Sequence, residues 1–223
     1  MSPASMEIIA WRHPKPQGAA GRCIGRTDLP VDHRKARRLA HRIRQAARRH
    51  GWPHVVCTSP LQRCAMVGRE LRRWGWRHVI DASLLEMDFG AWDGQPWTAI
   101  PHEEVDRWCA DFRHGRPGPP DGQGASGEPG EPGESLQAMF DRVEAGLAAS
   151  AAKTSTRPGN MPMLVVAHGG WMQIARWLSA GLPPPSDPAS WPSPPAYGEC
   201  LRMVLAQSVL RSVGVHAGLN TAR

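Results

Sequence analysis

The chain has 223 residues, a length that one α/β domain with a sizeable hydrophobic core can fill, so we expect a single domain over residues 1–223. With 41% hydrophobic residues, 21% charged residues and no apolar run near the ~20 residues that span a bilayer, the composition excludes a membrane-spanning class. The first residues lack the pattern of a signal peptide, which favours the cytoplasm, and the net charge of +7 suits an anionic partner without identifying one.

The first elements in chain order are a strand and a helix. Residues 6–11 form a short apolar run that predicts a buried strand. Asp32 is placed to cap a helix whose apolar residues, from Ala36 to Ala47, make one stripe while arginines fill the remaining faces. This distribution is typical of a solvated helix packed on a sheet and matches no nucleic-acid-binding module, so we expect no specific nucleic-acid binding.

The next elements continue the alternation. Residues 54–58 predict a second strand, and Ser59 as N-cap with Pro60 at the first helical position predict a helix whose first turn contains Arg63. Further helices are predicted within 136–147 and 171–178, and further strands at 163–167 and 201–206. The alternation predicts a three-layer α/β/α sandwich with a mostly parallel central sheet.

Two segments are predicted to be loops. Residues from about 113 to 133 are too polar and too rich in glycine and proline to pack, which predicts a flexible loop, and residues from about 182 to 195 form a stiff, proline-rich connection. The sequence GQGASG at 122–127 has the spacing of a dinucleotide-binding motif, but no strand precedes it and no helix follows, so no cofactor is expected. The five cysteines contain no C-x-x-C pair, which predicts reduced, mostly buried thiols and no metal site.

Polar side chains follow three of the predicted strands. Arg12 and His13 end the first, Arg63 comes shortly after the second, and His168 with two glycines ends the third. In an open α/β sheet, ligands bind at the carboxyl ends of the strands, so we expect these side chains to converge. Arginine forks suit a phosphate, and histidine, which can be neutral near pH 7, is a nucleophile that forms covalent intermediates. The sequence therefore predicts an anion pocket that transfers a phosphoryl group.

Phosphoryl transfer to a histidine releases an alkoxide that needs a proton, and a carboxyl group is the usual source. Glu86 is the best candidate, since it lies in the largely apolar segment LLEMDFGAWDG, while Asp88 and Asp93 compete for the role. Pro14 biases His13 away from the α-helical region, which stiffens the turn and aims the ring.

These motifs carry a resemblance to a known family. In order, WRHPKP, GRCIGRTDLP, TSPLQR, LLEMDFGAWDG, PGES and AHGG resemble the histidine phosphatase (phosphoglycerate mutase-like) superfamily, from about residue 7 to 178. Within it, GRCIGRTDLPVD and EMDFGAWDG look most like the α-ribazole phosphatase branch of cobalamin synthesis. The resemblance implies that His13 becomes a phosphohistidine, that Arg12, Arg63 and His168 bind the phosphoryl group, and that Glu86 protonates the leaving oxygen and then activates water. It implies no metal.

Four positions depart from the family pattern. Pro14 stands where the family often has the glycine of R-H-G, Ile24 replaces a tyrosine of the branch, and Gln173 replaces an arginine often found after H-G-G. The polar residue that commonly follows the R-H-G turn has no clear equivalent, and Gln17 is a possible substitute as a phosphate-binding residue. Ile24 and Gln173 bear on substrate identity, and either Trp92 or Trp97 is a candidate for the pocket wall.

The first functional hypothesis is a phosphomonoester hydrolase that acts on a small phosphorylated metabolite, with α-ribazole 5′-phosphate as the expected substrate. The alternatives are a broad-specificity phosphomonoesterase or a phosphoglycerate mutase-like enzyme and, outside the enzymes, a basic nucleic-acid-binding domain without catalysis. The sequence does not predict an oligomeric state.

Overall fold

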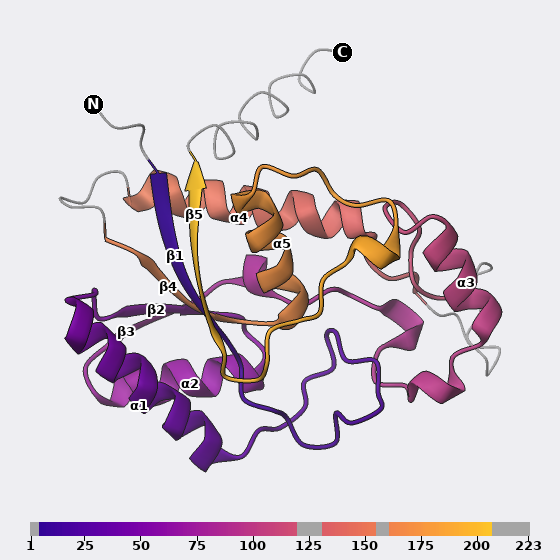
Figure 1. Ribbon diagram of the computed structural model, residues 1–223. Coiled ribbons are helices and arrows are strands. Elements are labelled where there is room, and N and C mark those ends of the chain that lie inside the picture. The colour runs from indigo at the N-terminus through magenta and orange to yellow at the C-terminus, as the bar shows by residue number, and fades with distance from the viewer. Residues whose placement is uncertain (1–4, 120–130, 155–160, 207–223) are drawn as a thin grey trace, which may run out of the picture.

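The computed structural model describes residues 5–119, 131–154 and 161–206, and in it a five-stranded sheet has the order β3-β2-β4-β1-β5 (Figure 1). Four strands run parallel, and the fifth lies antiparallel at one edge, beside β1. The strands are β1 (Ser5–Arg12), β2 (Val55–Thr58), β3 (Arg77–Ile80), β4 (Met163–Ala167) and β5 (Cys200–Ala206). The predicted, mostly parallel sheet is confirmed.

Helices cover both faces of the sheet, as Figure 1 shows, which confirms the three-layer α/β/α architecture. Because side chains alternate along a strand, Ile8 and Ala10 of β1 join the core against α4 and α5, whereas Ile9 and Trp11 join the core against α1 and α2. The α-helices are α1 (His33–His50), α2 (Gln62–Arg73), α3 (His102–Ala110), α4 (Leu136–Thr154) and α5 (Gly169–Ser179).

The helix α1 is built as its sequence predicts. The Asp32 carboxylate accepts hydrogen bonds from the backbone N–H groups of Arg34, at 2.7 Å, and Lys35, at 3.2 Å. The helix ends at Gly51, whose φ of 65° is the left-handed conformation that suits a helix C-terminus. Its apolar stripe is buried and its arginines are largely exposed.

Several sequence predictions need correction. The helix α2 begins at Gln62 with Leu61 as N-cap, two residues later than predicted, although the Ser59 hydroxyl accepts from the Leu61 N–H at 3.3 Å and also from His168. Neither β3 nor α3 was predicted, and α3 has no fully buried residue to mark an apolar face. The structure has no disulfide among the five cysteines, all of which it describes, but only Cys23 and Cys64 are buried, so the thiols are not mostly buried.

The predicted flexible loop is also revised at its ends. Residues 120–130, with the GQGASG motif, lie outside the described residues. On either side of them the chain packs: Pro117 and Gly133 are buried, and the Gly133 N–H donates to the Pro117 carbonyl at 2.8 Å. Within the described ranges, no helix has both the length and the apolar character needed to cross a bilayer. The cytoplasmic location and the single-domain organisation stay predictions.

Candidate active site

Strand register brings the two candidate histidines together. The strands β1 and β4 are parallel neighbours in which Arg12 pairs with Ala167, so the next residues, His13 and His168, leave the sheet side by side. Their ring centroids are 5.0 Å apart, with the planes inclined by 61°. The His13 N–H also donates to the Ala167 carbonyl at 3.0 Å, which continues the ladder one residue past β1. The convergence inferred from the strand ends is therefore present.

Arg63, in the first turn of α2, is almost fully buried and tightly held. Its Nη1 donates to the Thr27 carbonyl at 2.7 Å, its Nη2 to the Gly25 carbonyl at 2.6 Å, and its Nε to Nδ1 of His168 at 3.2 Å. A guanidinium has five N–H donors, so these contacts leave one donor on each terminal nitrogen for a ligand. The protein thus fixes the orientation of this guanidinium, and one N–H of each terminal nitrogen stays available to an anion.

The turn that holds Arg63 is itself organised by Asp93. One carboxylate oxygen accepts from the N–H groups of Gly25, at 3.1 Å, and Thr27, at 3.0 Å, and from the Thr27 hydroxyl at 2.5 Å. The other accepts from the Arg26 N–H. Glycine is required at position 25, because a Cβ there would lie 2.1 Å from the Met87 carbonyl oxygen. The motif WDG therefore supplies the carboxylate that holds the turn of GRCIGRTD, and this turn holds Arg63.

Arg12 lies between the end of the sheet and the proline-rich segment that precedes β5. Its guanidinium stacks over the Tyr197 ring, 4.0 Å from the centroid, and its Nη1 donates to the Pro195 carbonyl at 2.5 Å. The buried Nε has no hydrogen-bond partner among the described residues. A Cβ at Gly169 would lie 3.4 Å from the same guanidinium, an ordinary contact, and 3.0 Å from the Pro194 Cβ, so this glycine mainly gives room to the proline-rich segment. Arg12 keeps donors available to an anion in the cavity.

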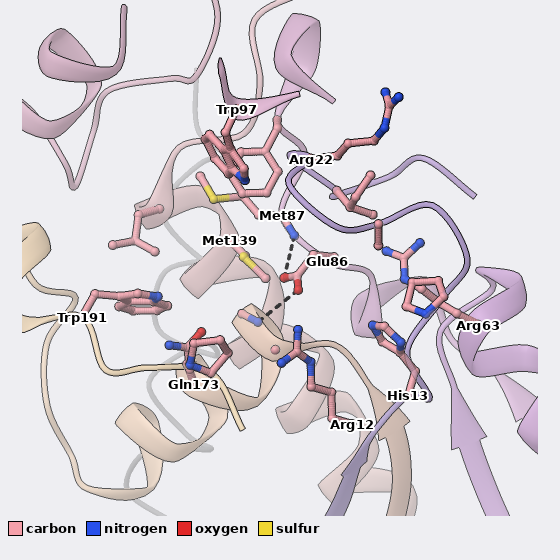
Figure 2. Close-up of a pocket in the computed structure, with 18 of the residues that line it drawn as sticks. Arg12, His13, Arg22, Arg63, Glu86, Met87, Trp97, Met139, Gln173 and Trp191 are labelled. Carbon is pink, nitrogen blue, oxygen red and sulfur yellow. Dashed lines mark hydrogen bonds between the residues drawn. The ribbon is translucent and has the colours of Figure 1, made fainter. Parts of the chain in front are cut away.

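Glu86 faces the space that these residues border, as Figure 2 shows. Its Oε1 accepts from the Met87 N–H at 3.0 Å, and its Oε2 accepts from the Gly170 N–H, in the first turn of α5, at 3.1 Å. A Cβ at Gly170 would lie 2.4 Å from Oε1, so the second glycine of AHGG is needed for this contact. Each carboxylate oxygen keeps a second lone pair for a proton or a water.

Arg142 of α4 anchors the segment that carries Glu86. It forms a bidentate pair with Glu134 at 2.8 Å for both contacts, and its Nη1 donates to the carbonyls of Ser83, at 3.0 Å, and Leu85, at 3.1 Å. Sequence reasoning missed this role. Glu134 lies in the PGES motif, which was a usable signal, but Arg142 is one of many arginines and nothing in its spacing singles it out.

His13 is held as a neutral nucleophile. Its Nδ1 donates to the Pro14 carbonyl at 2.8 Å, and because a carbonyl only accepts, Nδ1 carries the hydrogen and Nε2 carries the lone pair. Burial, with the charge of Arg63 second, lowers the pKa of His13 to about 3, although the bond to Pro14 opposes the shift. The ring is therefore uncharged at neutral pH, with Nε2 available for attack.

His168 is uncharged as well, but it is placed behind the cavity rather than in its wall. Burial and the nearby Arg63 hold the pKa of His168 well below its usual value. Its Nδ1 accepts from Arg63, so Nε2 carries the hydrogen and donates to the Ser59 hydroxyl at 2.9 Å. With both ring nitrogens engaged by protein, His168 orients Arg63 in this structure, and the direct phosphoryl contact implied by the resemblance stays a prediction.

A cavity of about 540 Å³ opens at this end of the sheet, and Arg12, His13, Arg63 and Glu86 all line it. Ile24 and Gln173, two positions that depart from the family pattern, line it too. Of the two tryptophans considered for its wall, Trp97 lines it, whereas Trp92 is buried, donates to Glu104 and does not.

Three other candidates lie outside this cavity. Gln17 is exposed, its backbone N–H donates to the Pro30 carbonyl, and the geometry gives no support to its assignment as a phosphate-binding residue. Asp88 and Asp93 line a separate hollow beside Arg26 and Thr27. Among the three acids considered, only Glu86 borders the space beside His13, so the geometry favours it as the general acid.

A comparison of the sequence with models of known protein families shows which family the chain belongs to. The profile of the histidine phosphatase superfamily (branch 1) matches residues 8–202. The chain belongs to this superfamily. The resemblance inferred from the motifs is thus confirmed at the level of the family, as a histidine phosphatase superfamily hydrolase, whereas the α-ribazole branch stays a prediction.

Several solved structures share the fold of this superfamily member over most of their length. A mycobacterial glucosyl-3-phosphoglycerate phosphatase in complex with VO3 is 19% identical, with 88% of this chain and 90% of that chain covered and a TM-score of 0.66. YhfR of Bacillus stearothermophilus is 19% identical, with 88% and 90% covered and a TM-score of 0.64. A third structure, a protein of Thermus thermophilus, is 22% identical, with 88% and 92% covered and a TM-score of 0.54. No curated protein matches the sequence. At these identities the likeness establishes the fold.

Proposed function

We propose that this histidine phosphatase superfamily member hydrolyses a phosphate monoester in two steps, through a phosphohistidine at His13. One observation carries the proposal: the Nδ1 hydrogen of His13 is fixed on the Pro14 carbonyl, which leaves the Nε2 lone pair beside two arginines in the wall of a cavity. A neutral imidazole is nucleophilic, and the two guanidinium groups offset the charge of a phosphoryl group and its transition state.

In the first step, the Nε2 lone pair of His13 forms a bond to phosphorus as the bond to the leaving oxygen breaks. Protonated Glu86 gives its proton to that oxygen, so the products are a neutral alcohol, the Glu86 carboxylate and phosphohistidine. The His13 ring gains positive charge as it attacks, and its Nδ1 bond to the Pro14 carbonyl stabilises that charge.

In the second step, water attacks the phosphorus while Glu86 accepts a proton from it. The bond between phosphorus and Nε2 breaks, inorganic phosphate leaves, and neutral His13 and protonated Glu86 are restored. The chemistry needs no electron transfer and no group beyond the chain's own side chains, water and substrate, so we expect activity in the presence of a metal chelator.

The supporting residues act through Arg63 and Glu86. Arg63 stabilises the transferring phosphoryl group with the two donors that its protein contacts leave available, and His168 with the 25–27 turn keeps those donors oriented. The first residues of α5, Gly169 and Gly170, line the cavity, so the positive end of this helix adds to the attraction for an anion. The mycobacterial neighbour, solved with VO3 and with inorganic phosphate, binds ligands of the class that such a site takes.

We propose α-ribazole 5′-phosphate as the first substrate to test, because the segments around Cys23 and Met87 resemble that branch. A broad-specificity phosphomonoesterase is the alternative, since Ile24 and Gln173 change two positions of the family pattern in the cavity wall. The arginines of α1 belong to a helix whose apolar side packs against the sheet, and nothing about them favours a non-catalytic nucleic-acid-binding role.

The experiment is steady-state hydrolysis of p-nitrophenyl phosphate, ethyl phosphate and α-ribazole 5′-phosphate with EDTA present. We expect turnover by the wild type and a loss of at least about 10³-fold in kcat for His13→Asn, as when a covalent nucleophile is removed. His102→Asn, which makes the same change at an exposed histidine outside the cavity, is the matched control and should keep wild-type rates. A wild type that hydrolyses no monoester, or His13→Asn with full activity, would show that the proposal is wrong.

A further inference from the structure

The cavity is far larger than a phosphoryl group, and the part beyond the phosphate end is apolar. A wall of aromatic, aliphatic and thioether side chains surrounds it, formed by Ile24, Met87, Phe89, Trp97, Leu136, Met139 and Trp191. Apart from Arg12, Arg63 and Glu86, the charged residue lining this cavity in the described chain is Arg22, which is exposed and donates to the Gly94 carbonyl. The leaving group of a substrate would therefore lie mostly against apolar surface.

Of the three tryptophans that line the cavity, Trp108 packs between Phe89 and Phe112, and Trp97 and Trp191 border the apolar part from different segments, as Figure 2 shows for these two. Trp97, on a short 3-10 turn (Trp97–Ala99), is 43% exposed and meets the edge of Phe89 with ring centroids 6.3 Å apart. Trp191, on the proline-rich connection, stacks on Trp177 with centroids 6.1 Å apart. Trp191 is thus fixed by packing, whereas Trp97 presents a large ring to solvent. A flat, apolar ligand would cover that ring.

The polar groups in the wall do not favour a second anionic group on the substrate. Gln173, at the position where the family often has an arginine, is neutral, and its amide donates to the Pro192 carbonyl. A carboxylate or second phosphate in the apolar part would lose water, and with Arg12 and Arg63 occupied by the transferring phosphoryl group, Arg22 is the remaining cationic side chain that lines the cavity in the described chain.

We infer that the leaving group of the substrate is an uncharged alcohol that carries an aromatic ring, and that Trp97 is a determinant of this specificity, with Trp191 as the fixed opposite wall. The inference rests on the proposed function and narrows it to a substrate class. α-Ribazole 5′-phosphate falls within this class because its leaving group carries a neutral, fused aromatic ring, whereas phosphoglycerates fall outside it.

The test compares phosphate esters of primary alcohols. Their leaving groups have similar acidity and differ mainly in the aromatic, aliphatic or charged surface that would contact the cavity wall. The panel is 2-(naphthyl)ethyl phosphate, 2-phenylethyl phosphate, ethyl phosphate and 3-phosphoglycerate. Burying one aromatic ring should raise kcat/KM about 10- to 100-fold over ethyl phosphate. In Trp97→Ala the ratio of kcat/KM for the naphthyl ester to that for ethyl phosphate should fall about tenfold, and Trp97→Phe should recover most of it.

Ile80→Ala is the matched control, because Ile80 is an exposed apolar residue at the end of β3 that does not line the cavity. Thermal unfolding of each variant shows whether Trp97→Ala is folded, and the Phe variant keeps the test decisive if it is not. The inference would be overturned if 3-phosphoglycerate or ethyl phosphate had a kcat/KM equal to or above that of the aromatic esters. It would also be overturned if both Trp97 variants kept the wild-type ratio of kcat/KM for the naphthyl ester to that for ethyl phosphate. In either case His13-dependent hydrolysis would stand. If no ester is hydrolysed, the proposed function fails, and the substrate class fails with it.

Discussion

Replacing Asp93 by alanine tests the support of Arg63 directly. The change removes a carboxylate that accepts from three backbone N–H groups, of Gly25, Arg26 and Thr27, and from one hydroxyl. A hydrogen bond to a charged group contributes about 1.5–3 kcal/mol, but this turn is only half-buried and water can replace some of these contacts. We therefore expect the free energy of unfolding to fall by about 2–4 kcal/mol.

The same substitution should lower activity although Asp93 does not line the cavity. The carbonyls of Gly25 and Thr27 hold both terminal nitrogens of Arg63, so a loosened turn lets the guanidinium move away from its position. A displacement of about 1 Å costs up to about 10²-fold in rate, which sets the expected loss in kcat/KM at about 10- to 100-fold. Asp93→Asn, which keeps an acceptor oxygen but not the charge, should fall between the alanine variant and the wild type in both stability and rate.

The assay must distinguish this role from that of a general acid. Urea unfolding gives the stability, and kcat/KM is measured with p-nitrophenyl phosphate, whose leaving group needs no proton, and with ethyl phosphate, whose leaving group does. Misplacement of Arg63 should lower both values by a similar factor. A loss confined to ethyl phosphate would instead make Asp93 the proton donor. Wild-type stability together with wild-type rates would refute the account of the turn.

The remaining predictions concern Glu86, its anchor and the two histidines. Glu86→Gln should lower kcat for ethyl phosphate by about 10²- to 10⁴-fold and that for p-nitrophenyl phosphate far less, because only the first needs a proton donor; equal losses would argue against the acid role. Arg142→Ala, which frees the segment carrying Glu86, should show the same substrate pattern with a smaller loss, in the same steady-state assay. Folding lowers the pKa of His13 to about 3 and the pKa of His168 well below its usual value of about 6.5. Below pH 6.5 the unfolded chain therefore binds more protons than the folded chain, so the free energy of unfolding should fall as the pH drops from about 6.5 toward 3. Each histidine should contribute a slope approaching about 1.4 kcal/mol per pH unit, and His13→Asn should show a shallower fall than the wild type in urea unfolding measured across this range; an unchanged slope would contradict the neutral, buried His13.

Much of the catalytic end could be predicted because it depends on local patterns and on one topological rule. The short apolar runs of β1 and β4, which are buried on both faces of the sheet, mark the strands, and parallel strands place their carboxyl ends together, so the sequence alone groups Arg12, His13 and His168. Arg63 followed from its place in the first turn of the helix after β2.

The parts that could not be predicted depend on contacts between segments that are distant in sequence. Asp93 supports a turn more than 60 residues earlier in the chain, and no local pattern encodes that partner. The Ser59 hydroxyl accepts from the Leu61 N–H, as a residue before a helix does, but it also receives a hydrogen bond from His168, a tertiary contact that no local pattern encodes. Trp191 lies in a segment whose composition indicates only a stiff connection, and Tyr197 follows that segment, yet both line the cavity.

The central claim is that a neutral His13 attacks phosphorus with its Nε2, and rapid-quench capture of the phosphorylated enzyme tests it most directly. The wild type and Glu86→Gln are mixed with p-nitrophenyl phosphate, quenched within milliseconds at alkaline pH, where phosphohistidine survives, digested and analysed by mass spectrometry. The account predicts one added phosphoryl group on the peptide that contains His13, more of it in Glu86→Gln because hydrolysis of the intermediate is slowed, and none in His13→Asn. Turnover with no phosphorylated enzyme at any quench time, or a phosphoryl group located on another residue such as Ser59, would contradict it.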